Sequence, residues 1–210
     1  MTSVPTSSGQ RSDAAGWCSL RDRGGLAMGA AWVVLVAVAV VGRIWRPEWD
    51  GSPLWNVTPL AAVALAAGAL FPSRAVAASV PLAALAIGNL VEPAYGSLAM
   101  AAVVYAASAW PVLLGGLVNR FRWAAVVGGA AASSAAFFLT TNLAHWFFVG
   151  GYARSAAGLV ECMAAALPFY RPLGDLCWSL VLFAGIVAAG VAEEMLARRL
   201  HPAPASRQGR

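Results

Sequence analysis

Residues 26–45 read LAMGAAWVVLVAVAVVGRIW, an apolar run that contains one charged residue, Arg43, near its end. As an α-helix with a rise of 1.5 Å per residue, a run of about 20 residues spans about 30 Å, the thickness of the hydrocarbon core of a bilayer. The run is longer than the apolar core of a signal peptide, and no small-residue cleavage site follows it. We therefore expect a retained first transmembrane helix.

The composition of the whole chain points to the same class of protein. Hydrophobic residues make up 60% and charged residues 11% of the 210 residues, against about 45–50% and about 25% in a soluble domain. The mean hydropathy is +0.70. A soluble domain of this size has too little interior for so much apolar surface. A cytosolic enzyme, a disordered regulator and a nucleic-acid-binding protein are therefore disfavoured, and an integral membrane protein is predicted.

The remaining apolar runs predict the architecture. Ser155–Leu167, with about 13 residues before Pro168, is too short to span a bilayer and indicates a re-entrant or interfacial helix. The expected fold is an all-α membrane protein, a bundle of six transmembrane helices with this short helix before the last span. Residues 1–24 are expected to be a disordered cytoplasmic tail, 25–197 the transmembrane domain and 198–210 a cytoplasmic tail. The five further spans are expected at 57–71, which is short for a bilayer, 75–91, 97–118, 123–149 and 173–196.

The arginines predict the orientation. All 14 cationic residues are arginine, and the net charge is +5. They lie at the edges of apolar runs and form no stripe, as is typical of topological signals and lipid contacts and not of nucleic-acid binding. With the N-terminus inside, ten arginines fall on the inner side and four on the outer side. We therefore expect a multi-pass protein of the cell inner membrane with both termini cytoplasmic.

Polar and aromatic residues gather beside the three loops that this topology places outside. Unsatisfied polar groups near hydrocarbon cost several kcal/mol, so these side chains either pair with one another or line a watery cavity. A short, proline-interrupted helix beside such a cluster indicates a binding site in transport folds. The hypothesis is a ligand-binding pocket open to the outer side, with amides as donors and acceptors, aromatic walls and Arg171 as an anion contact. Its candidate residues are Asn56, Thr58, Asn89, Tyr95, Thr141, Asn142, His145, Trp146, Tyr170, Arg171 and Asp175.

Several of these residues, and Glu161 on the short helix, also have a purely structural interpretation. Asp175 can cap the last helix, where the helix dipole favours a carboxylate, and its spacing from Arg171 favours an ion pair. Thr141 and Asn142 can cap the end of the fifth span. His145 can be an interface-packing residue, and Glu161 a residue on a solvated face.

Other patterns bear on packing and chemistry. Small residues at four-residue spacing, such as Ala62/Ala66, Gly128/Ala132 and Gly185/Ala189, predict close helix packing, within the bundle or against a partner. Cys162 and Cys177 can share one side of the membrane, and free thiols are the favoured interpretation. Zinc-protease, serine-hydrolase and nucleotide-binding motifs are absent from the sequence. We expect no catalytic residue, no metal site, no cofactor and no enzyme activity.

Three ordered motifs carry a family resemblance. They are Asn56-x-x-Pro59-x-x-Ala62-x-Ala64-Leu65, Thr141-Asn142-x-x-x-Trp146 and Ala165-Ala166-Leu167-Pro168-Phe169-Tyr170-Arg171-x-x-Gly174-Asp175. In this order they resemble a family of small bacterial multi-span membrane proteins of unknown function. That family resembles in layout the substrate-capture subunits of energy-coupling factor transporters, which are six-helix vitamin or metal binders with both termini inside.

The leading expectation is a membrane protein that captures a small solute from the outer side. Its partners would be the lipid bilayer, the solute and an energising membrane protein, with no nucleic acid. The alternative is a non-catalytic assembly or scaffold subunit that packs on a partner through the small-residue stripes.

Overall fold

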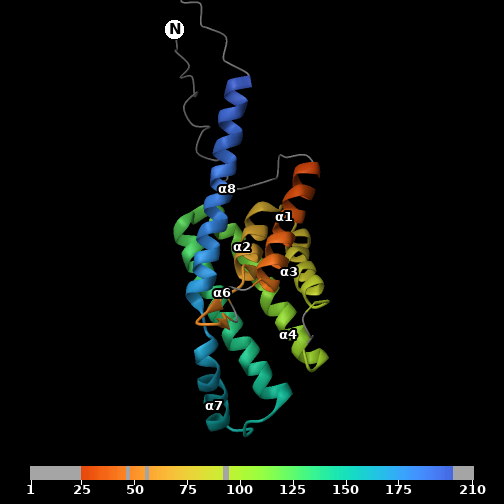
Figure 1. Ribbon diagram of the computed structural model, residues 1–210, viewed down its shortest axis with the longest axis vertical. Helices are drawn as coiled ribbons and strands as arrows, with labels where there is room; N and C mark the ends of the chain where they lie inside the picture. Colours follow the sequence, from red (N-terminus) through yellow and green to blue (C-terminus); the bar gives the residue numbers. More distant parts are fainter. Residues whose placement is uncertain (1–24, 46–47, 55–56, 92–94, 201–210) are drawn as a thin grey trace, which may run out of the picture.

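The computed structural model describes residues 25–45, 48–54, 57–91 and 95–200. In these ranges the protein is helical apart from one short hairpin (Figure 1). The expected tail 1–24 lies outside the described residues, and the last helix extends to Leu200, three residues into the expected C-terminal tail. The elements are α1 (Gly25–Ile44), β1 (Glu48–Trp49), β2 (Ser52–Pro53), α2 (Leu60–Leu70), α3 (Arg74–Gly88), α4 (Leu98–Ala109), η1 (Trp110–Leu114), α5 (Gly115–Phe121), α6 (Trp123–Ala144), η2 (His145–Val149), α7 (Ala156–Ala166), η3 (Leu167–Phe169) and α8 (Pro172–Leu200).

Four stretches of helix are long and apolar enough to cross a membrane. They are α1, the α4–η1–α5 segment over Leu98–Arg120, the α6–η2 segment over Trp123–Val149, and α8 over Pro172–Leu196. α2 and α3 have 11 and 15 residues, which corresponds to about 17 and 22 Å of helix. Four of the six expected spans are therefore of spanning length, and α2 and α3 are shorter.

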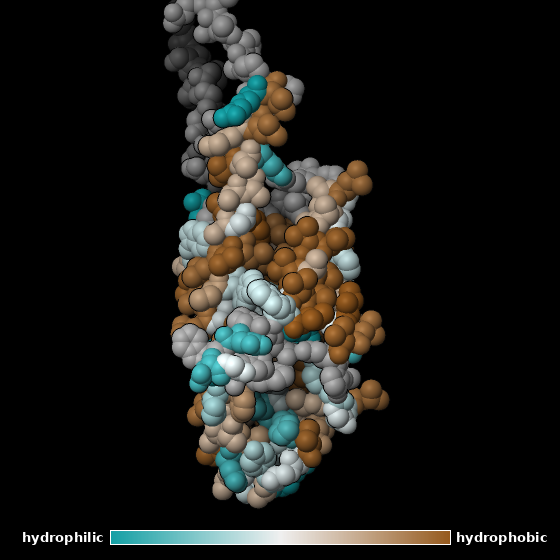
Figure 2. Space-filling model, in the orientation of Figure 1, coloured by the Kyte–Doolittle hydropathy of each residue, from teal (hydrophilic) through white to brown (hydrophobic). Residues whose placement is uncertain are grey.

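The surface agrees with a membrane environment. Large apolar side chains such as Val33, Val34 and Val41 of α1 are more than half exposed. Figure 2 shows hydrophobic residues over the middle of the molecule, around α1 and α3, and more hydrophilic residues at the lower end, where α7 lies. Exposed apolar surface of this kind is unfavourable in water and favourable in lipid.

The short helix α2 forms the centre of the bundle. It packs against α1, α3, α5, α6 and α8, and ten of its 11 residues are buried. Its small side chains let the neighbours approach closely, since Ala62, Ala64 and Ala66 are fully buried. The small-residue stripes of this segment therefore serve packing inside the protein.

Glycines make the closest of these contacts. A Cβ atom on Gly68 of α2 would overlap the carbonyl group of Val112 in η1. A Cβ atom on Gly115, at the start of α5, would overlap the backbone of Gly68 and Ala69. Because the obstructing atoms belong to the backbone, neither site can relax by moving a side chain.

Side-chain hydrogen bonds join the helices around α2. The Trp32 indole N–H of α1 donates to Ser79 Oγ of α3 at 2.9 Å. The Asn119 amide of α5 donates to the carbonyl of Ala69 in α2 at 2.9 Å, and Arg74 donates to the carbonyl of Val112. The bonds from Asn119 and Arg74 satisfy backbone carbonyls near the close crossing, and the bond from Trp32 joins α1 to α3.

The connection between α1 and α2 contains a feature that was not expected. β1 and β2 pair antiparallel through Asp50 and Gly51, whose φ angles are +51° and +71°. Two central residues with positive φ form the mirror-image turn that suits a two-residue hairpin, and Asp-Gly is a typical sequence for it. The Asp50-Gly51 pair was the sequence signal from which this hairpin could have been predicted.

Replacement of Gly115 by alanine tests the close crossing. Overpacking against backbone costs about 3 kcal/mol or more in a site that cannot relax, so the Gly115→Ala variant should melt at a clearly lower temperature in detergent. The matched control is Gly128→Ala on α6, where an added Cβ meets no atom within 4 Å. The control should keep or gain stability, by up to about 1 kcal/mol, from helix propensity. Equal melting temperatures for the two variants would contradict the packing described for α2.

Candidate functional site

A cavity of about 380 Å³ lies among the ends of several helices. The C-terminal end of α1, the N-terminal ends of α2 and α8, and parts of α3, α4, α6 and the η3 region form its walls. The lining combines apolar and aromatic side chains with polar ones. The polar and charged members of the lining are Arg43, Thr58, Tyr95, Ser108, Ser133, Ser134, Thr141, Asn142, Tyr170, Arg171 and Asp175.

The structure brings most of the predicted site residues together at this cavity. Asn56 lies outside the described residues, and Asn89, His145 and Trp146 do not line the cavity. The seven that line it are Thr58, Tyr95, Thr141, Asn142, Tyr170, Arg171 and Asp175.

On α6, the polar side chains are anchored to their own helix. Thr141 Oγ1 donates to the carbonyl of Phe137 at 2.7 Å, and the Asn142 amide donates to the carbonyl of Phe138 at 2.7 Å. Hydrogen bonds to the preceding turn keep these side chains ordered without a ligand. The lone pairs of the Thr141 hydroxyl and the Asn142 carbonyl oxygen are the groups that a solute could use.

Aromatic side chains form one wall. The rings of Phe138 on α6 and Tyr170, between η3 and α8, have centroids 4.8 Å apart and a tilt of 42°. Phe137 and Phe169 also line the cavity. Such a wall favours flat apolar groups by packing and by aromatic contact.

The charged groups lie on several helices. Arg43 of α1 is held by Asn89, whose Oδ1 accepts from the guanidinium at 3.1 Å and whose Nδ2 donates to Tyr105 Oη at 3.1 Å. Asp175 lies in the first turn of α8 and lines the cavity together with Ser134 of α6.

The predicted ion pair between Arg171 and Asp175 is wrong. Both residues are described and no ion pair joins them. α8 begins at Pro172, so Arg171 precedes the helix and the spacing of a regular helical turn does not apply to it. Asp175 is the fourth residue of α8, so it does not cap the helix, but its place in the first turn agrees with the interpretation that the helix dipole favours a carboxylate there.

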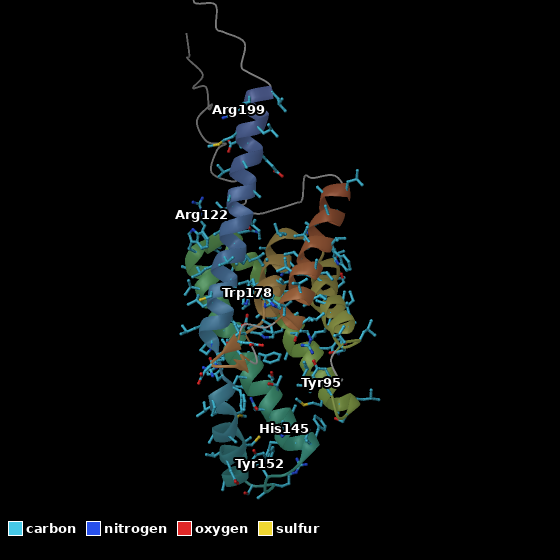
Figure 3. All side chains as sticks on the ribbon, in the orientation of Figure 1. Tyr95, Arg122, His145, Tyr152, Trp178 and Arg199 are labelled. Atoms are coloured by element: carbon cyan, nitrogen blue, oxygen red, sulfur yellow. The ribbon has the colours of Figure 1, made fainter. Side chains whose placement is uncertain are left out.

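His145 and Trp146 do not line the cavity at which they were predicted. They begin the π-helical turn η2 at the end of α6, and His145 and Tyr152 both lie at the lower end of the molecule (Figure 3). The Trp146 indole N–H donates to the carbonyl of Ala153 at 2.9 Å, and the Arg154 guanidinium lies 5.5 Å from the Trp146 ring centroid. These contacts fasten the connection to α7.

The remaining predicted features are structural. Glu161 is exposed on α7, as expected for a solvated face. Cys162 and Cys177 are free thiols, and the Cys162 thiol donates to the carbonyl of Asn142 at 3.7 Å. Burial raises the pKa of the Cys162 thiol, which disfavours the reactive thiolate. In the described part of the chain, no three His, Cys, Asp or Glu side chains are grouped so that they could hold a metal ion.

Sequence reasoning missed several lining residues. Arg43 was counted only as a topological signal, although an arginine within an apolar span is itself an indication of a functional site. Ser133 belongs to the small-residue pattern of α6 and Ser134 was not singled out, yet both line the cavity together with Phe137 and Phe138.

The fold and the cavity define an all-helical protein of the membrane class. The chain belongs to a family of unknown function, DUF6580, which matches residues 27–197. The match confirms the prediction of an uncharacterised family, and it covers a longer stretch of the chain than the three motifs do. No curated protein and no solved structure matches the chain.

Proposed function

We propose that this chain is an inner-membrane protein that captures a small solute in the cavity described above. The observation that carries the proposal is the convergence of seven independently predicted side chains on one cavity of about 380 Å³. Small-molecule sites are typically about 300–1,000 Å³, mostly apolar, with a few polar groups that fix orientation. The lining has this character.

The proposed topology has six crossings: α1, α2, α3, α4–α5, α6 and α8. Successive members of this series run in opposite directions along the long axis in Figure 1. α2 is short, but it is buried in protein, so its ends need not meet lipid.

The orientation follows from the arginines. Arg122 and Arg199 lie in the upper half of the molecule, where the described chain begins and ends. Tyr95, which lines the cavity, lies in the lower half (Figure 3). The positive-inside rule then favours a cytoplasmic upper end. The cavity would open to the outer side. Transport would need a separate energising partner, because the sequence contains no nucleotide-binding motif.

Reporter fusions test the topology. A fluorescent protein fused after Leu200 should be fluorescent and alkaline phosphatase at the same point inactive, because that end is cytoplasmic. At Gly151, in the connection between η2 and α7, the two reporters should give the opposite result. The same result at both positions would contradict an outer location of the cavity.

Solute capture is tested on the purified full-length protein in mild detergent. Mass spectrometry should detect a retained small molecule, and that molecule should raise the melting temperature on re-addition. Asp175→Asn should weaken its binding about tenfold, as expected for loss of a charge-assisted hydrogen bond. Glu161→Gln, an equivalent loss of charge on an exposed residue outside the cavity, should leave binding unchanged. Folded protein with no retained solute and no response to a solute library would contradict the proposal.

The assembly alternative is supported by a different observation. Gly128 of α6 and Gly185 of α8 meet no atom within 4 Å of an added Cβ, and Ala132 and Ala189 beside them are exposed. These outward small-residue faces could pack against a partner helix. A capture subunit with an energising partner would also use such a face.

Replacing Gly128 and Gly185 by leucine separates the two functions. If assembly is the main function, the variant should lose a co-purifying membrane protein while it keeps its own melting temperature. If solute capture is the main function, the retained solute should be unaffected. A variant that keeps both the partner and the solute would exclude a role for these two faces in assembly and in capture.

A further inference from the structure

Three hydroxyl groups in the lining of the cavity have already used their hydrogen atoms within the protein. Ser133 and Thr141 of α6 each donate to the backbone carbonyl four residues earlier, at 2.6 and 2.7 Å. Ser108 of α4 does the same at 2.8 Å. A hydroxyl has one hydrogen and two lone pairs, so only the lone pairs of these groups remain for a ligand. The cavity therefore offers hydrogen-bond acceptors to its occupant.

Asp175 adds a carboxylate to this lining. An ionised carboxylate only accepts hydrogen bonds, and no arginine in the described part of the chain forms an ion pair with Asp175. Of the two arginines that line the cavity, Arg171 is exposed and Arg43 donates to Asn89 at the end of α3. A carboxylate placed in this way within a membrane span indicates a functional group. It favours a cationic ligand.

The lining residues of α6 form three successive layers on one face of the helix. They are two serines at 133–134, two phenylalanines at 137–138, and a threonine and an asparagine at 141–142. Asp175 belongs to the serine layer, because Ser134 is its side-chain neighbour. Tyr170 belongs to the aromatic layer, where its ring lies 4.8 Å from that of Phe138. The first and last layers are about 12 Å apart along the helix axis.

Tyr95 gives an independent indication of an occupant. Its side chain lines the cavity, and its hydroxyl oxygen is buried without a hydrogen-bond partner among the described residues. A buried polar group of this kind is costly, and at a cavity a bound ligand or water is its usual partner. An N–H or O–H group of a ligand would satisfy the lone pairs of this oxygen.

We propose that the solute is a primary amine whose ammonium group binds at Asp175 and Ser134. An ammonium group has three N–H donors and no acceptor, so it complements a lining rich in acceptors. The apolar or aromatic body of the amine packs on Phe138 and Tyr170, whose rings also attract a neighbouring cation. A second donor, at the other end of the molecule, reaches Thr141.

This inference rests on the proposed solute site and specifies the chemistry of its ligand. A free amine and the ethanolamine headgroup of a phospholipid both carry a primary ammonium group. The experiment separates these two sources by the lipid that surrounds the protein and by the mass of any molecule that the protein retains.

The probes are two amines, each paired with the alcohol of the same shape. Tyramine is paired with 2-(4-hydroxyphenyl)ethanol, and 2-phenylethylamine with 2-phenylethanol. Binding is measured by thermal shift and calorimetry on the full-length protein, in an amine-free buffer, in detergent and in nanodiscs of phosphatidylcholine, which has no primary ammonium group. Each amine should bind about tenfold or more tightly than its alcohol. Tyramine should bind more tightly than 2-phenylethylamine, because its phenol can donate to Thr141.

Asp175→Asn tests the ammonium contact, because it removes the charge and keeps the shape of the side chain. The variant should lose the preference for amines, while its affinity for the alcohols stays the same. The control is Glu161→Gln, an equal change of charge on an exposed residue of α7 that does not line the cavity. This control should keep the full preference for amines.

Thr141→Val and Thr140→Val form a matched pair that tests the second contact. Both hydroxyls donate to the backbone carbonyl four residues earlier, at 2.7 and 2.6 Å, but Thr140 is exposed and does not line the cavity. Both variants should remain folded, because valine has nearly the shape of threonine. Thr141→Val should remove the advantage of tyramine over 2-phenylethylamine, and Thr140→Val should leave it unchanged.

Four results would overturn the inference. The first is equal affinity for amines and alcohols, or no binding of any probe, in a protein that still retains a solute; solute capture would then stand with a different ligand. The second is a preference for amines that Asp175→Asn leaves unchanged, and the third is an advantage of tyramine that survives in Thr141→Val. The fourth is a phosphatidylethanolamine retained by the wild type and lost in Asp175→Asn, which would assign the site to a lipid headgroup. If neither a probe nor a retained solute is found, the proposed function falls as well.

Discussion

The close approach of backbones around α2 is the constraint on which the rest of the structure depends. In a bilayer, helices gain little from the hydrophobic effect when they associate, so contact between small residues supplies much of the packing energy. Gly68 and Gly115 allow the α2 and α5 backbones to touch, and the fully buried alanines of α2 allow other helices to surround it. Because α2 is short, α4 and α6 extend beyond it toward the lower end of the molecule (Figure 1), and Leu60 at the N-terminal end of α2 lines the cavity. The same shortness therefore creates both the tight centre and the hollow beside it.

The small-residue stripes illustrate what a pattern alone cannot decide. The pairs on α2 and Gly129 on α6 face inward, and Gly129 meets the side chain of Leu65. Gly128, one residue earlier, faces open space, and so does Gly185. Sequence spacing is the same in both cases, because each stripe repeats at four residues. The direction of a stripe depends on how the whole bundle is assembled.

The lengths of apolar runs predicted much of the secondary structure. The run expected at 123–149 is the stretch that α6 and η2 occupy, and the short helix expected at Ser155–Leu167 is α7 with Ser155 as its N-cap. The run expected at 57–71 contains a helix of only 11 residues. Its central position was not predictable, because hydropathy measures apolar character and does not distinguish contact with lipid from contact with protein.

The lining of the cavity could be predicted only in part, because the sequence shows which residues are polar but not where the folded chain places them. Thr141, Asn142, Tyr170 and Asp175 stand out in the sequence because polar groups at membrane depth are costly. His145 follows Thr141 by four residues, but the chain leaves regular α-helix at His145, which does not line the cavity. Arg43 lies at the end of an apolar run, where an arginine ordinarily marks the membrane surface, and its link to Asn89 and Tyr105 depends on tertiary structure.

The dimensions of α2 also constrain how the protein is made. An 11-residue helix is too short to be held across a bilayer by its own hydrophobicity, and a nascent chain that ends after α2 lacks the neighbours that bury it. α2 therefore takes its place only when α3, α5, α6 and α8 have been synthesised and gather around it. The burial of α2 is therefore complete only when the helices that follow it in the chain have formed around it.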